Sequence, residues 1–167
     1  MIEEQKLEVG GVFKVEQIRD GKVIDSWEEK NRVVNEGLNS LLDVQLGAGS
    51  QLTTWYVGLF EGNFTPAAED TAANIASNAT ESTAYDEATR PAWSPAAVSS
   101  QTITNSASKA TFTMNAGKSI YGAFLISDST KSGTAGFLFA ATKFSAVRTV
   151  EPTDQLLVTY TVSATSA

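Results

Sequence analysis

The chain of 167 residues contains no histidine and no cysteine. Histidine is the side chain whose unperturbed pKa lies near neutrality, so its absence removes the usual proton shuttle and the usual activator of a serine nucleophile. The absence of cysteine excludes thiolate nucleophiles, disulfide bonds and thiolate metal sites, and it fits a reducing compartment such as a cytoplasm. Most catalytic mechanisms are therefore excluded, and we expect no cofactor and no metal.

Long hydrophobic runs and positive charge are also scarce. No apolar run approaches the roughly 18 residues that a membrane-spanning helix needs, and residues 1–6 are acidic and do not resemble a signal peptide. The chain has 12 Lys and Arg against 19 Asp and Glu, a net charge of −7, and its basic residues are scattered singly. Since affinity for nucleic acid comes from neutralising phosphates, we expect no nucleic-acid partner and no membrane partner.

What the chain does contain is a series of short β-type segments between turns rich in Gly, Ser, Thr and Asn. Residues 11–18 alternate between apolar and polar side chains, which is typical of a half-buried strand. Asp20-Gly21 is a strong signal for a hairpin turn, and residues 22–27 follow as the returning strand. Phe13 and Trp27 are expected to anchor this hairpin to the core.

Residues 35–46 break the β pattern and predict one short helix. Asn35 stands where an N-cap would accept free backbone amides, and Gly47 stands where a glycine would end the helix. Four leucines recur at helical spacing and are expected to form the buried face: Leu38, Leu41, Leu42 and Leu46.

The middle of the chain changes character after a buried strand predicted at residues 55–60. Gly58 in that strand is expected where something large crosses closely. Residues 61–100 hold three of the four prolines and few large aliphatic residues. They predict a long irregular excursion or arm inserted in the domain, with a turn or two of helix at residues 71–77. Residues 1–10 are expected to form a second extension, an N-terminal arm.

Strand patterns return in the last third of the chain. Apolar or alternating stretches occupy residues 107–114, 119–127, 136–142 and 155–163. Many short strands separated by turn clusters favour a sandwich or barrel over an α/β fold. The length predicts one mainly β domain that spans residues 1–167.

Two groups of acidic residues could serve sugar hydrolysis, which needs one protonated and one ionised carboxyl group. These groups are Asp25, Glu28 and Glu29, and Glu81, Asp86 and Glu87. The structural alternatives are a solvated strand end and a solvated loop, because nothing indicates the apolar pocket that would raise the pKa of one carboxyl.

Residues 128–133 carry oxygen donors for calcium, but Lys131 opposes a cation and the spacing is not that of an EF-hand. A hairpin connection is favoured there.

A stretch that contains prolines also holds three large side chains, those of Tyr85, Arg90 and Trp93. Trp, Tyr and Arg are enriched among the residues that dominate protein–protein binding. These three, together with Phe64 in the same excursion, are therefore the predicted partner contacts. The alternative is an arm that folds back and packs Trp93 on its own domain. The sequence leaves both possibilities open.

Six stretches of the chain carry a further signal. They are residues 30–39 (Lys-Asn-Arg-Val-Val-Asn-Glu-Gly-Leu-Asn), 54–60 (Thr-Trp-Tyr-Val-Gly-Leu-Phe), 85–91 (Tyr-Asp-Glu-Ala-Thr-Arg-Pro), 103–106 (Ile-Thr-Asn-Ser), 121–125 (Tyr-Gly-Ala-Phe-Leu) and 157–162 (Leu-Val-Thr-Tyr-Thr-Val). Together they resemble a family of small virion structural proteins of tailed bacteriophages, and the likeness covers most of residues 11–163. The resemblance implies a head decoration or cement protein with a jelly-roll-like body, and it brings no catalytic residues with it.

Combined with the β pattern, the resemblance implies a non-enzymatic capsid decoration protein built as a jelly-roll-like or related two-sheet β-sandwich. Its expected partners are the major capsid protein and itself, as a homodimer or homotrimer. Its expected location is the capsid exterior of a virion assembled in the host cytoplasm. Such a protein stabilises the shell because it binds the assembled lattice better than free subunits, and multivalency strengthens contacts that are individually modest.

Three alternatives stay open. The chain could be a tail or fibre component of the virion, which copy number per particle would distinguish from a head protein. It could be a glycan hydrolase that works through carboxylates such as Glu81 and Asp86. It could also be a carbohydrate-binding jelly roll that stacks a sugar on Trp93 or Trp55, although the apolar neighbours of Trp55 favour a place in the core.

Overall fold

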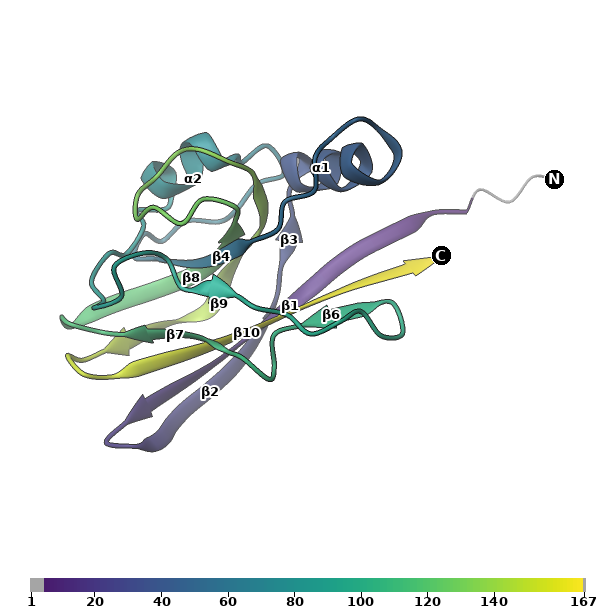
Figure 1. The fold of residues 1–167 in the computed structure, drawn as a ribbon. Helices are drawn as coiled ribbons and strands as arrows, with labels where there is room; N and C mark the ends of the chain where they lie inside the picture. The colour runs from purple at the N-terminus through teal and green to yellow at the C-terminus, as the bar shows by residue number, and fades with distance from the viewer. Residues whose placement is uncertain (1–4, 167) are drawn as a thin grey trace.

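The computed structural model describes residues 5–166, which form two antiparallel sheets and two helices (Figure 1). In chain order the elements are β1 (Leu7–Arg19), β2 (Lys22–Lys30), β3 (Arg32–Val33), α1 (Asn35–Leu46), β4 (Trp55–Phe60), α2 (Ala72–Asn78), β5 (Ala92–Trp93), β6 (Thr102–Thr104), β7 (Ala110–Thr113), β8 (Lys118–Ile126), β9 (Leu138–Val150) and β10 (Gln155–Ser166). Sheet A has the order β2-β1-β10-β6, with β7 also paired to β10, and sheet B has the order β3-β9-β8-β4-β5. The predicted mainly β, two-sheet sandwich is confirmed.

The first two strands form the hairpin that Asp20-Gly21 predicted. The φ angles of the two turn residues are 51° and 74°, the left-handed geometry of a two-residue turn that matches the twist of paired strands. Phe13 and Trp27 are buried in the core, as expected. β2 continues to Lys30, beyond the predicted end, because its pairing with β1 continues that far.

The main core lies between the two sheets. Phe13 of β1 and Tyr160 of β10 stack with their ring centroids 4.2 Å apart, and burying a side chain of this size contributes about 1.5–3 kcal/mol. Further members of this core come from both sheets, among them Val15, Phe112, Leu156 and Val158 from sheet A, and Val57, Leu59, Ile120, Leu125 and Phe139 from sheet B.

A second apolar cluster includes residues of sheet B and of α2. Gly58 of β4 is paired with Phe124 of β8, and two residues further on Phe60 is paired with Gly122. A Cβ on either glycine would overlap the ring that belongs to the other strand. The expectation that a large group crosses at Gly58 is confirmed, and that group is the Phe124 ring. Ile75 of α2 completes this cluster.

α1 has the predicted bounds but not the predicted cap. Val34 precedes the helix with an extended backbone and makes no side-chain capping hydrogen bond. Asn35 is therefore the first helical residue and does not act as the N-cap. At the other end the backbone amide of Gly47 donates to the carbonyl of Asp43, which ends the helix where the sequence predicted.

The buried face of α1 also differs from the prediction. Leu42 and Leu46 are 51% and 83% exposed, and Leu38 and Leu41 are only half-buried, so the expectation that the four leucines form a buried face is wrong. The physical reason is Gly37, the buried residue of this helix. A Cβ at Gly37 would overlap the backbone of Phe139 in β9, so the helix packs most closely there and turns Leu42 and Leu46 to solvent.

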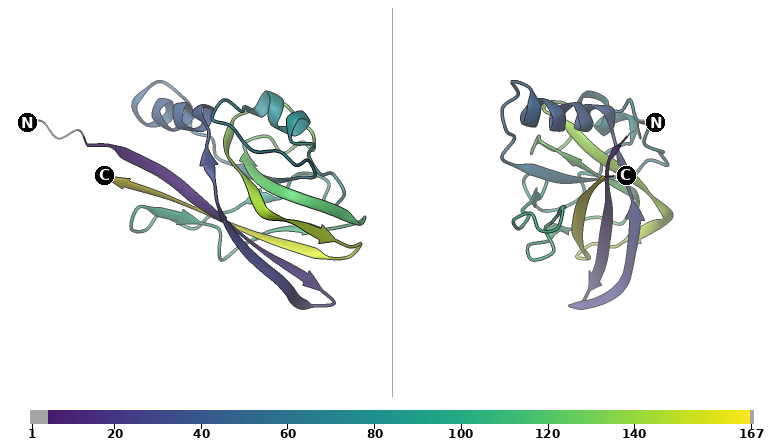
Figure 2. Two further views of the ribbon diagram at one scale, coloured as in Figure 1. Left: turned by 180° about the vertical axis from the view of Figure 1, so that it is seen from behind. Right: turned by 90° about the vertical axis from the view of Figure 1, so that its right-hand side faces the viewer.

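The excursion at residues 61–100 packs on its own domain instead of extending from it. It contains α2, close to the helix predicted at 71–77, and the two-residue strand β5, and the rest is irregular. Thr71 and Asn74 form a capping box at the start of α2. Both helices lie above sheet B, on the side away from sheet A (Figure 2).

The predicted N-terminal arm falls into two parts. Residues 1–4 lie outside the described residues. Residues 7–10 belong to β1 and pair with residues 163–166 of β10. These strand ends, which we call the terminal ribbon, run together past the body of the sandwich (Figures 1 and 2).

Candidate functional site

Arg90, a predicted partner contact, is fully buried in the protein's own fold. Its Nε and Nη2 atoms donate to the two carboxylate oxygens of Glu81 at 2.8 and 2.7 Å. Its guanidinium also donates to the carbonyls of Asp128, at 2.8 Å, and Gly133, at 3.1 Å, and lies 5.4 Å from the ring centroid of Phe124. Arg90 thus ties the excursion to the loop between β8 and β9.

Tyr85 and Trp93 are buried as well. The Tyr85 ring packs edge to face on Phe112 with centroids 5.0 Å apart, and burial raises the pKa of its hydroxyl. Lys131 covers that ring, with Nζ 3.9 Å from the centroid, and donates to the Tyr85 carbonyl at 2.8 Å. The indole N–H of Trp93 donates to the carbonyl of Tyr160 at 3.0 Å.

The structure therefore corrects the picture of an outstretched arm with these side chains at its surface. Tyr85, Arg90 and Trp93 are 1%, 0% and 8% exposed, so the alternative of an arm folded back on its own domain describes this chain. Phe64 keeps part of its surface, with its ring 6.3 Å from that of Phe60. Partner contact through Phe64 stays a prediction.

The loop at residues 128–133 is the connection between β8 and β9 that the sequence favoured. Asp128 accepts a hydrogen bond from the backbone amide of Thr130 at 3.0 Å, and Lys131 points to Tyr85. Among residues 5–166, no group of three acidic side chains is placed to hold a metal ion.

The acidic residues considered for sugar hydrolysis are mostly engaged in structural contacts. The Glu81 side chain has no exposed surface, and it also accepts from the backbone amide of Ser132. Glu87 accepts from the amide of Thr113 at 3.0 Å, whereas Asp86 is exposed. The first group is spread along β2: Asp25 pairs with Arg148, Glu28 with Lys14, and Glu29 with the amide of Ser145.

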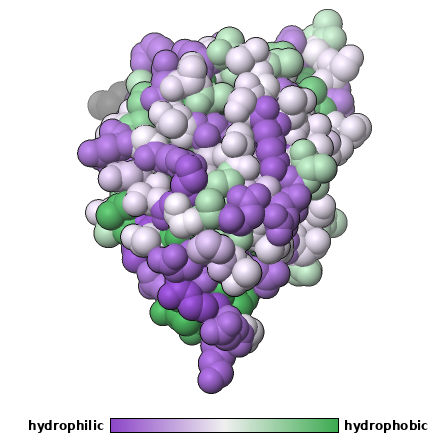
Figure 3. All heavy atoms as spheres, turned by 90° about the vertical axis from the view of Figure 1, so that its left-hand side faces the viewer, coloured by the Kyte–Doolittle hydropathy of each residue, from purple (hydrophilic) through white to green (hydrophobic). Residues whose placement is uncertain are grey.

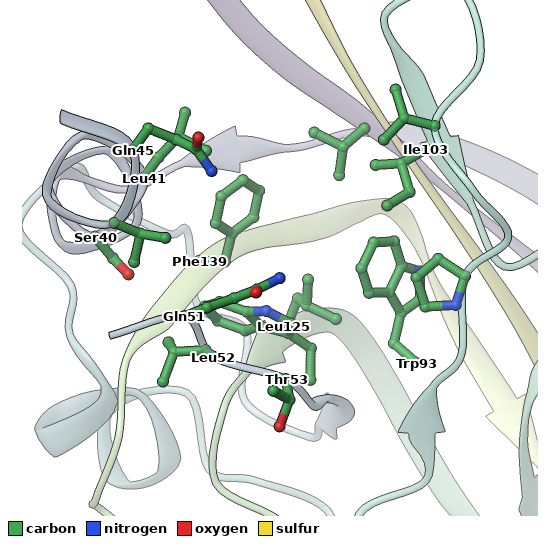
Figure 4. Close-up of a pocket in the computed structure, with 15 residues that line it drawn as sticks. Ser40, Leu41, Gln45, Gln51, Leu52, Thr53, Trp93, Ile103, Leu125 and Phe139 are labelled. Atoms are coloured by element: carbon green, nitrogen blue, oxygen red, sulfur yellow. The ribbon is translucent and has the colours of Figure 1, made fainter. Parts of the chain in front are cut away.

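The described part of the chain contains an apolar groove of about 640 Å³ (Figure 4). Leu41 of α1 and Leu52 lie on one wall, and Trp93 and Ile103 lie on the other. Phe139 of β9 lies between them. The lining is completed by Ser40, Val44, Gln45, Gln51, Thr53, Trp55, Pro95, Val98, Leu125 and Val162. We call this hollow the groove.

No charged side chain lines the groove. Its polar side chains are the hydroxyls of Ser40 and Thr53 and the amides of Gln45 and Gln51, which all come from α1 and the segment that follows it. The other wall consists of aliphatic, proline and tryptophan side chains. Burying an unpaired charge costs much more than burying an uncharged group, so the groove suits an uncharged, largely apolar guest with hydrogen-bonding groups along one side.

The pairing of β4 with β5 places two tryptophans in the groove. Trp55 and Trp93 are directly opposed in this antiparallel pair, so their side chains lie on the same face. The ring of Trp55 packs edge to face on Phe139 with centroids 5.7 Å apart. Trp55 is partly exposed, and it lies at the core boundary rather than inside the core.

Most of these residues were not found as a site by sequence reasoning. The sequence predicts Trp93 as a partner contact and allows Trp55 as a sugar platform, whereas its leucine pattern predicts that α1 faces the core. The only sequence signal for the α1 wall is its surplus of apolar residues, since a 12-residue helix that buries mainly Gly37 leaves several of them uncovered.

A different face of the molecule has less to offer a partner. The side shown in Figure 3 is largely hydrophilic or neutral, with hydrophobic atoms gathered near its lower end, where the β1–β2 hairpin lies. Val23 and Ile24 of β2 are 56% and 49% exposed. Because these two side chains sit on a protruding hairpin and not in the groove, the groove is the candidate functional site.

Comparison with models of known protein families gives no match, and no curated protein sequence matches the chain. Within residues 5–166, neither helix combines the length and hydropathy needed to span a bilayer.

Proposed function

We propose that this protein is a non-enzymatic structural component of a tailed-phage virion, a decoration or cement protein that binds the outer capsid surface. In this proposal the groove receives an uncharged apolar segment of the major capsid protein. The family resemblance supports a place in the virion, and the groove supports the proposed mode of binding.

The observation that carries the proposal is the groove itself. A few aromatic and aliphatic anchors in a dry pocket supply most of the free energy in typical protein–protein interfaces, and the groove offers Trp55, Trp93 and Phe139 for such an anchor. The chain has a net charge of −7, but the lining of the groove is uncharged, so this charge does not directly select which segment binds in the groove. Modest affinity per copy is sufficient, because every capsomer joint adds another contact.

Burial of the ionic groups elsewhere supports a binding role over a catalytic one. Glu81, whose side chain has no exposed surface, has both carboxylate oxygens bound by Arg90. A general acid must be free to reach a substrate atom, and Glu81 is not. Hydrolysis through the pair of Glu81 and Asp86 therefore lacks one of its two members.

The first experiment is to quantify the protein in particles of the phage that encodes it. A head protein is expected in a copy number that scales with the number of capsid subunits, whereas a tail or fibre component is expected in a small multiple of the tail symmetry. Particles that lack the protein are expected to lose their DNA at lower temperature, and adding purified protein is expected to restore them. Absence of the protein from purified particles would overturn the proposal.

The second experiment tests the groove with two matched variants. Val98 lines the groove and is 66% exposed, whereas Val147 of β9 is 47% exposed and does not line it. Val98→Glu is expected to weaken binding to particles by at least roughly tenfold, because a charge would have to be buried unpaired. Val147→Glu is expected to bind as the unaltered protein does. Equal binding by both variants would contradict docking through the groove.

Binding of a neutral glycan is a second candidate function, supported by the same lining. Two tryptophans together with Gln45, Gln51 and hydroxyl groups are the side-chain types that stack on sugar rings and bind their hydroxyls. A screen of purified protein against uncharged polysaccharides distinguishes the two candidates. Saturable binding that Val98→Glu abolishes, with no binding to particles, would favour the glycan.

A further inference from the structure

The terminal ribbon has an open edge along the start of β1. β10 pairs with β1 from Leu7 onward, but β2 pairs with β1 only from Val12 onward. Among residues 5–166, no strand pairs with residues 7–10 of β1 on the β2 side. An uncovered strand edge presents backbone N–H and C=O groups that another strand can pair with.

The direction of these backbone groups follows from one hydrogen bond. The amide of Asn31 donates to the carbonyl of Gly11 at 3.1 Å, so the backbone groups of Gly11 face the β2 side. Backbone groups alternate between the two edges of a strand, so those of Leu7 and Val9 face the open side, and those of Glu8 face β10. The Leu7 side chain is 62% exposed.

We propose that this edge pairs with the same edge of a second copy of this chain, antiparallel about a two-fold axis through Leu7. In an antiparallel pair, residues that face each other have backbone groups of the same orientation. A two-fold axis must therefore lie midway between one residue and the same residue of the second copy, which face each other. The candidates for that residue are Lys6, Leu7, Glu8 and Val9.

Charge and occupancy select among these four registers. An axis through Lys6 or Glu8 would place each of these charges opposite its own copy, and like charges directly opposite each other are destabilising. An axis through Val9 would require the carbonyl of Gly11, which already accepts from Asn31. An axis through Leu7 avoids both problems.

The register through Leu7 also brings favourable contacts. Leu7 faces Leu7 of the second copy, and Lys6 faces Glu8 of the second copy on both sides of the axis. The pairing spans residues 5–9, so it ends before the place where β2 begins to cover β1. The resulting assembly joins the two copies of sheet A into one continuous sheet. Its contact is short, so the association is weak and depends on concentration.

A cysteine cross-linking experiment tests the register directly, because the chain has no cysteine of its own. Under mild oxidation, Leu7→Cys is expected to give a disulfide-linked dimer, since opposed residues have Cα atoms about 5.5 Å apart, within disulfide range. Gln5→Cys is the matched control, because it leaves the pairing of Lys6 with Glu8 intact. In the proposed register the two substituted residues are offset along the strands, so their Cα atoms lie farther apart than the roughly 7 Å that a disulfide spans. We expect Leu7→Cys to cross-link at least tenfold faster, and equal rates would overturn the register.

Sedimentation velocity over a concentration series tests the pairing without a covalent bond. Glu8→Lys is expected to raise the dimer dissociation constant at least fivefold, because it opposes Lys6 with a second lysine. The double variant Lys6→Glu with Glu8→Lys restores opposite charges and is expected to return the constant to within twofold of the original. A protein that stays monomeric at every concentration, or a double variant as weak as Glu8→Lys, refutes the proposal.

Leu7→Pro provides an independent measurement. Proline removes an amide that faces the open edge and makes no bond to β10, so folding is expected to be unchanged while association is lost. A thermal unfolding curve that matches the original protein confirms the first part. Association that survives in this variant would show that the copies meet elsewhere. These outcomes are independent of capsid binding, which the groove variants test.

Discussion

The buried pair of Arg90 and Glu81 allows a quantitative test of how the excursion is held. Arg90→Met removes both hydrogen bonds to the Glu81 carboxylate and both to backbone carbonyls, and it leaves a carboxylate with no exposed surface. Breaking a buried ion pair from one side costs about 3–5 kcal/mol. Typical domains have only about 5–15 kcal/mol of stability in total, so this one substitution removes a large fraction of it.

The effects of substituting Arg90 and Glu81 on the free energy of unfolding are expected to be coupled rather than additive. Glu81→Gln should also destabilise the protein, because it leaves the buried guanidinium with the more distant Asp128 carboxylate, at 3.8 Å, as its counter-charge. The variant with both Arg90→Met and Glu81→Gln should recover part of the loss, with a coupling energy of about 1–3 kcal/mol, since no unpaired charge remains. Recovery should be incomplete because the carbonyls of Asp128 and Gly133 have lost a donor.

Urea unfolding followed by tryptophan fluorescence and by circular dichroism measures these free energies. For a chain of this size a loss of 3–5 kcal/mol corresponds to a fall in Tm of roughly 6–20 °C. Arg90→Lys serves as a control that keeps the charge but cannot make the two-pronged contact with the carboxylate, and it should fall between the original and Arg90→Met. A loss below about 1 kcal/mol for Arg90→Met, the range of an exposed ion pair, would refute the reasoning.

Three further predictions concern packing, pH and helix capping. Gly58→Ala is expected to cost about 1–3 kcal/mol in urea unfolding, because the new methyl overlaps the Phe124 ring. The hydrogen bond and charge of Arg19 lower the pKa of Asp154 to about 2, so its stabilisation is complete above the unfolded pKa of about 4 and is lost as pH falls from about 4 towards 2. Asp154→Asn should flatten the fall in Tm over that window, and an unchanged profile would contradict the assignment. Thr71→Ala removes a capping side chain from α2 and should cost about 1 kcal/mol in the same unfolding assay.

Features that depend on neighbours in sequence were predictable. The Asp20-Gly21 turn and the bounds of α1 follow from residues within a few positions, and both are confirmed. Gly58 was also interpreted correctly, because a glycine inside an apolar strand already indicates a close approach. What the sequence could not name was the approaching group, since Phe124 reaches Gly58 only through the pairing of β4 with β8.

Features that depend on distant segments were not predictable. The sequence predicts Arg90 as a partner contact because its actual partners are distant along the chain: Glu81 is 9 residues away, and the carbonyls of Asp128 and Gly133 are 38 and 43 residues away. The groove is hidden for the same reason, as its lining runs from Ser40 to Val162. The exposed Leu42 and Leu46 show the reverse case, in which a helical pattern was present but tertiary packing at Gly37 set the orientation.

The pairing of β1 with β10 has a consequence for biosynthesis. Twelve residue pairs, from Leu7 with Ser166 to Ile18 with Gln155, join the earliest described strand to the latest. Sheet A therefore cannot close until residues 155–166 have left the ribosome, and until then the apolar side of the β1–β2 hairpin stays uncovered. Nascent chains stalled before that point should be captured by chaperones and cut by proteases, and chains stalled well beyond it should resist both.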